Sequence, residues 1–71
     1  MRLLSVGTQV KQTLATLKGA QSTLKIYVTQ IQHAETKKAY EDAIKKTGEI
    51  IGDLEKRVQV LEFEEPTYKG F

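Results

Sequence analysis

The sequence predicts an all-α protein: an antiparallel two-helix hairpin that dimerises into a four-helix bundle. No proline interrupts residues 8–65, and apolar residues recur there at intervals of three and four, as on one side of an α-helix. The recurrence changes phase once, near residue 36, which indicates a reversal of the chain. The hydrophobic core of a 71-residue chain gives only marginal stability unless a disulfide, a metal ion or self-association adds to it. The chain has no cysteine for a disulfide. Self-association is therefore the expected source of further stability.

The first helix is predicted for residues 6–33. Its apolar stripe fits a heptad repeat in which only one core position is polar. The core positions are Val10, Leu14, Leu17, Gln21, Leu24, Val28 and Ile31. Ser5 and Thr8 are competing N-cap candidates, because a hydroxyl accepts a hydrogen bond from a free N–H of the first turn.

The second helix is predicted for residues 37–64, after a turn at residues 33–37. Its core positions are Tyr40, Ile44, Thr47, Ile51, Leu54, Val58 and Leu61. A single continuous helix is disfavoured, because the first heptad would carry Lys38 and Lys45 into the core. Thr36 is the expected N-cap, and Pro66 ends the helix. Residues 65–71 form a C-terminal tail, and residues 1–71 make one domain.

Folding back near residue 36 gives the two sides of the hairpin different characters. On one flank Lys11 faces Glu62 and Lys18 faces Glu55. Exposed ion pairs contribute at most about 1 kcal/mol, so they select register and orientation more than they stabilise.

The other flank is mostly apolar. The predicted oligomer interface consists of Ala20, Tyr27, Ala43 and Ile50. A second hairpin would cover this flank and give a homodimer. The alternative is that the flank widens the hairpin's own stripe, with the ring of Tyr27 lying over the core.

Gln21 and Thr47 are predicted to form a polar layer in the middle of the core. Such a layer fixes register and oligomeric state if the two groups bond each other. The alternative is that both are tolerated near a wet edge.

The sequence gives no sign of catalysis, so we expect no enzyme activity, no metal site and no cofactor. His33 is the only histidine and lies at the predicted turn, where a solvated side chain is expected. No apolar run approaches the roughly 20 residues of a membrane span, which favours a cytoplasmic protein. A carrier with a small-molecule site in the bundle core is a further alternative.

Four lysines near the predicted turn offer a different function. Lys37, Lys38, Lys45 and Lys46 together could contact an anionic surface, either lipid or DNA. Three acidic residues are interspersed with them, and the whole chain has a net charge of only +2. This balance favours a solvated charged face and makes nucleic acid an unlikely partner.

The C-terminal tail ends in a motif built from Pro66, Tyr68, Lys69 and Phe71. Its aromatic side chains suit either of two roles: a lid on the open end of the bundle, or anchors for another protein. A disordered tail is the third alternative.

The stretch VGTQVKQTLATLKGAQSTL at residues 6–24, together with EEPTYKGF at the end, resembles domain-of-unknown-function family 1657 of spore-forming Firmicutes. The likeness covers nearly the whole chain and carries no catalytic signature. It implies a setting in spore resistance or germination, because genes of this family lie near those for spore membrane and dipicolinate-channel proteins. The resemblance supplies no molecular activity. From the helical hairpin and its tail we expect a non-enzymatic protein-interaction module, and the spore setting suggests a spore membrane protein as its partner.

Overall fold

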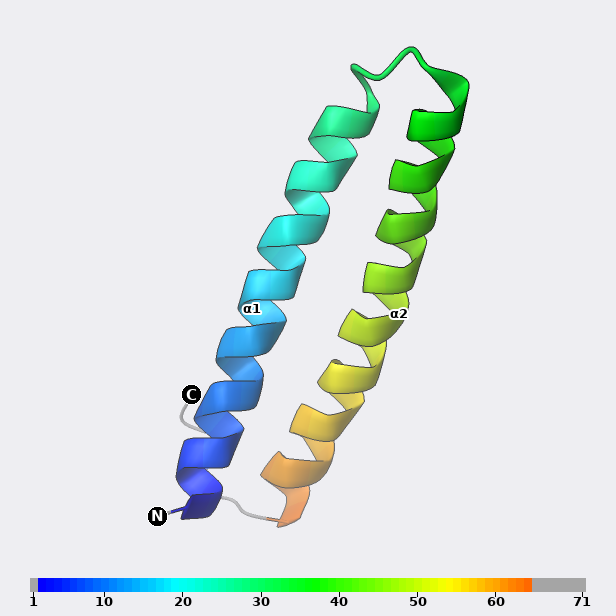
Figure 1. Ribbon diagram of the computed structural model, residues 1–71. Helices are drawn as coiled ribbons and strands as arrows, with labels where there is room; N and C mark the ends of the chain where they lie inside the picture. Colours follow the sequence, from blue (N-terminus) through cyan, green and yellow to red (C-terminus); the bar gives the residue numbers. More distant parts are fainter. Residues whose placement is uncertain (1, 65–71) are drawn as a thin grey trace.

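The computed structural model of the chain describes residues 2–64, with side-chain surroundings for residues 6–63. It contains two helices, α1 (Arg2–Val28) and α2 (Ala34–Glu64), which pack antiparallel along their length (Figure 1). No strand occurs in the described part of the chain. The molecule measures 48 × 15 × 15 Å. The predicted all-α hairpin is confirmed.

The core of the hairpin is the contact between the two predicted stripes, here called the seam. All fourteen predicted core positions are at least half-buried, including Ile31 in the loop. Only Ile51, at 7% exposed, is almost completely shielded among the described large apolar side chains. The two helices thus bring their apolar stripes into contact but do not shield them completely from solvent.

Two ion pairs fix the register along one edge of the seam. Lys11 Nζ lies 3.3 Å from Glu62 Oε2, and Lys18 Nζ lies 3.0 Å from Glu55 Oε2. Both pairs were predicted from the sequence and both are confirmed. This edge is called the ion-paired flank below.

The N-terminal end of α1 differs from the prediction. The helix begins at Arg2 rather than near residue 6, so Ser5 and Thr8 lie inside it and neither is its N-cap. Leu3 and Leu4 have high helix propensity, which favours continuing the helix through these residues. The helix propensity of these leucines therefore outweighed the capping preference of Ser5 and Thr8.

The connection between the helices also lies earlier than predicted, at residues 29–33 instead of 33–37. The last turn of α1 is tightened by hydrogen bonds three residues back, such as Gln30 N to Tyr27 O at 2.9 Å. The hydroxyl of Thr29 donates to the carbonyl of Ile26 at 2.6 Å. These bonds satisfy carbonyls at the end of the helix without a glycine.

The N-cap of α2 is His33, and the prediction of Thr36 is wrong. The backbone N–H of Thr36 donates to His33 Nδ1 at 3.4 Å, and the Thr36 hydroxyl lies 3.2 Å from the same atom. The His33 carbonyl accepts the first helical bond from Lys37 N at 2.9 Å. An imidazole nitrogen here fills the role that hydroxyls and carboxylates usually fill.

The predicted polar layer lies within the seam, and its two members bond the backbone of α2 rather than each other. Gln21 Nε2 donates to the carbonyl of Ile44 at 3.2 Å, and Thr47 Oγ1 donates to the carbonyl of Ala43 at 2.6 Å. Gly48 makes room for the glutamine, since a Cβ at this position would lie 3.1 Å from Gln21 Nε2. Gln21 therefore links the two helices directly.

Replacing the cap tests the start of α2. We expect His33→Ala to lower the free energy of unfolding by about 0.5 kcal/mol or more, because the Thr36 N–H loses its acceptor, and His33→Asn to retain the stability. Urea unfolding followed by circular dichroism at fixed protein concentration measures both. Equal stability of the alanine variant and the wild type would contradict the capping role.

Gly48 and Gly52 provide a matched test of the glutamine contact. A Cβ at Gly52 meets nothing within 4 Å, so Gly52→Ala should stabilise α2 by up to about 1 kcal/mol. Gly48→Ala should gain clearly less, because its Cβ displaces the Gln21 amide. In a Gln21→Ala background the two substitutions should become equivalent. A persistent difference there would show that Gln21 is not the obstacle.

Candidate interaction surface

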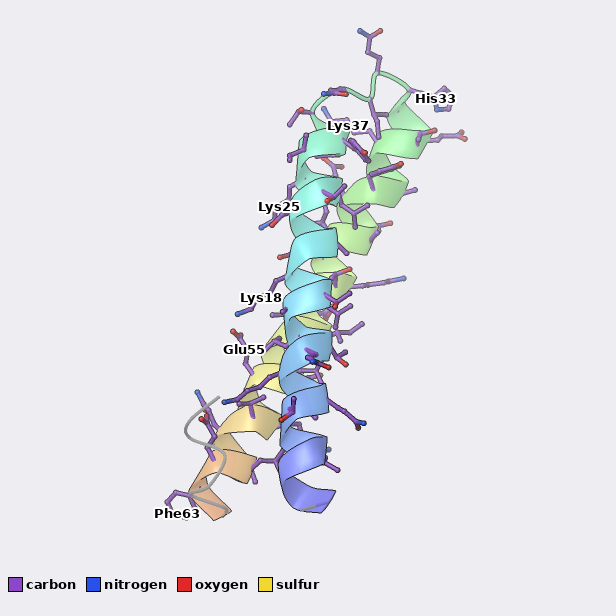
Figure 2. All side chains as sticks on the ribbon, turned by 90° about the vertical axis from the view of Figure 1, so that its left-hand side faces the viewer. Lys18, Lys25, His33, Lys37, Glu55 and Phe63 are labelled. Atoms are coloured by element: carbon purple, nitrogen blue, oxygen red, sulfur yellow. The ribbon has the colours of Figure 1, made fainter. Side chains whose placement is uncertain are left out.

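The predicted interface residues lie together on the flank opposite the ion pairs, here called the apolar flank: Ala20, Tyr27, Ala43 and Ile50. Figure 2 shows Lys18, Lys25 and Glu55 on one side of the hairpin, which marks the ion-paired flank. Tyr27 is 51% exposed and Ile50 is 50% exposed, while Ala20 is exposed and Ala43 is half-buried. The seam of a single hairpin therefore leaves half of each large side chain in water.

Further apolar side chains are exposed outside this flank. Phe63, at 87% exposed, projects away from the open end of the hairpin (Figure 2). Ile26 and Val60 also expose more than half of their surfaces. None of the three was predicted as a surface feature, although their heptad positions lie away from the seam and would have identified them.

The four turn lysines, Lys37, Lys38, Lys45 and Lys46, are all exposed near the start of α2. Within the described part of the chain none of them forms an ion pair, whereas Lys11 and Lys18 do. They are thus free to meet an external anion, and Glu41 and Asp42 lie among them on the same helix.

The described residues gather few groups that could perform chemistry. His33 is exposed and is occupied as a helix cap. Among the side chains of residues 6–63, no cluster of three or more histidine, cysteine or acidic groups is placed to hold a metal ion. Neither described helix is long and apolar enough to cross a membrane.

The C-terminal motif of Pro66, Tyr68, Lys69 and Phe71 lies outside the described residues. The described surface is that of the hairpin from residue 6 to residue 63.

Comparison with known proteins identifies a family. Neither the curated proteins nor the solved structures include a significant match to the chain. The model of the family described as "protein of unknown function (DUF1657)" matches residues 10–58, which span most of the seam and both halves of the apolar flank. The chain therefore belongs to domain-of-unknown-function family 1657.

Proposed function

We infer that the protein is a non-enzymatic interaction module that pairs with a second copy through the apolar flank to form a four-helix bundle. The half-exposed Tyr27 and Ile50 carry this conclusion. They lie in adjacent layers of one flank, on different helices, and a second hairpin would shield both at once.

The shape of the hairpin supports the same conclusion. Its radius of gyration is 15.5 Å, whereas a compact domain of this length would have about 11 Å. A side measuring 48 by 15 Å is close in area to the roughly 800 Å² that each partner buries in a standard interface. Pairing would therefore supply the core that the elongated monomer lacks.

The family resemblance suggests the setting of this module, spore resistance or germination. A spore membrane protein is the partner class that fits that setting. Pairing through the apolar flank leaves the outer surface of α2 accessible to such a partner.

Two neighbouring substitutions test the pairing. We expect Ala20→Glu to raise the dimer dissociation constant by about 100-fold or more, because a carboxylate would be buried without a partner. Ser22→Glu is the control, since it places the same side chain two residues away on the other side of α1. Sedimentation equilibrium over a concentration series measures both. A wild-type chain that is monomeric at every concentration, or equal dimerisation of both variants, would overturn the proposed function.

The exposed, unpaired turn lysines support a second candidate, binding to an anionic surface. For this function we expect binding to phosphatidylserine vesicles or duplex DNA to fall steeply between low and physiological salt. Replacing Lys37, Lys38, Lys45 and Lys46 by glutamine should abolish that binding. Binding that survives the four substitutions would exclude these lysines as the anion site.

A further inference from the structure

The two helices differ sharply in charge. Between residues 6 and 31 the only charged residues are Lys11, Lys18 and Lys25. Lys11 and Lys18 form the two ion pairs, and Lys25 lies on the same side of the hairpin (Figure 2). In contrast, nearly half of the residues of α2 are charged. Depletion of charge is the compositional mark of an interface core. The rest of the α1 surface, rather than that of α2, therefore has the character of a buried contact.

The part of this surface that adjoins the apolar flank is called the uncharged face: Gln9, Thr13, Thr16, Ala20, Thr23, Tyr27 and Gln30. All seven side chains are exposed. The hydroxyl of Thr16 donates to the carbonyl of Gln12 at 3.0 Å, and that of Thr23 donates to the carbonyl of Gly19 at 3.1 Å. Because both hydroxyls already donate to carbonyls within α1, a partner that covers Thr16 and Thr23 leaves neither hydroxyl without an acceptor.

The uncharged face has a projection at one end and a hollow at the other. Tyr27 projects near the loop. Towards the open end lies a shallow hollow of about 520 Å³, lined by Gln9, Gln12, Thr13, Thr16 and Leu17. Ala20 lies midway, seven residues from Tyr27 and seven from Thr13. A two-fold axis beside Ala20 would therefore bring the tyrosine of each copy to the hollow of the other.

This axis pairs the whole uncharged face with itself in an antiparallel sense. In three of the four kinds of contact, residues of the same type then meet across the axis. Ala20 faces Ala20 of the second copy, Thr16 faces Thr23, Gln9 faces Gln30, and Thr13 faces Tyr27. The smallest of these side chains lies at the axis, where two helices must approach most closely.

The second helix provides an independent check. The heptad register that agrees with the Lys11–Glu62 and Lys18–Glu55 pairs places Ala20 opposite Ile50, so the same axis must pass beside Ile50. It then places Ile50 against itself and Lys46 against Asp53 of the second copy. Opposite charges thus meet at two symmetry-related contacts on α2, whereas the position of the axis follows from α1 alone.

Two other arrangements lack this match. An axis midway between the layers of Ala20 and Tyr27 would set Lys46 against Lys46, which costs energy. A parallel pairing would set α1 against α2 and leave Lys46 and Asp53 opposite threonines.

We propose that two copies associate antiparallel, α1 against α1 and α2 against α2, about a two-fold axis that passes beside Ala20 and Ile50. This proposal rests on the proposed function and gives the dimer a geometry. The specificity-determining contacts are Tyr27 in the hollow around Thr13, and Lys46 with Asp53.

Charge reversal tests the α2 contacts. Lys46→Glu and Asp53→Lys should each raise the dimer dissociation constant by about fivefold, and the double variant should restore it to within about twofold of the wild type. The control is the reversal of Glu49 and Lys56, which have the same spacing and signs but lie on the outer face of α2. The acidic residue comes first in this control pair, whereas the basic residue comes first in the test pair. The control reversal should leave the dimer dissociation constant unchanged. Single reversals without rescue by the double variant would overturn the arrangement.

Disulfide formation tests the axis itself, because the chain has no cysteine of its own. Ala20→Cys should form a covalent dimer under mild oxidation, much faster than Thr13→Cys on the same flank or Ser22→Cys on the other side of α1. If the wild type is dimeric but Ala20→Cys links no faster than these controls, the arrangement is wrong and the proposed function stands. If the wild type is monomeric at every concentration, both the arrangement and the proposed function are wrong.

Discussion

Two helices in contact can shield only one stripe on each, and this limit governs the rest of the structure. Even in the middle of the seam, Ile51 is the only described large apolar side chain that is almost fully removed from water. The remaining core side chains keep an open edge on either flank. What lies along each edge therefore decides whether the hairpin is complete as a monomer or needs another molecule.

The two edges of the seam carry different kinds of side chain. Along one, Lys11 and Lys18 reach across the seam to Glu62 and Glu55. These pairs are solvated and favour this register over shifted ones without adding much stability. Along the other edge no charge bridges the helices among the described residues, and large apolar side chains stay half-exposed. One edge orients the hairpin, and the other is the edge at which we place association.

The polar layer reinforces this division. Gln21 occupies a core position but bonds a carbonyl of the facing helix, and Gly48 leaves the space for it. A polar side chain that must reach one particular carbonyl penalises a sliding of the helices more strongly than a leucine would. Register is thus held at several heights along the seam, which is the condition for the two halves of the apolar flank to line up.

The sequence by itself determined the two helices, their antiparallel sense, the membership of the seam and both ion pairs, because heptad periodicity reports burial directly. It also identified the residues of the apolar flank as a group. The heptad pattern did not determine the helix ends, which local side-chain bonds set: His33 caps α2 through a ring nitrogen, and Thr29 helps to end α1 by bonding the carbonyl of Ile26. Such bonds depend on side-chain geometry rather than on residue type, so the sequence pattern does not predict them. The partners of Gln21 and the hollow near Thr13 likewise follow from how the helices and side chains pack, which periodicity does not encode.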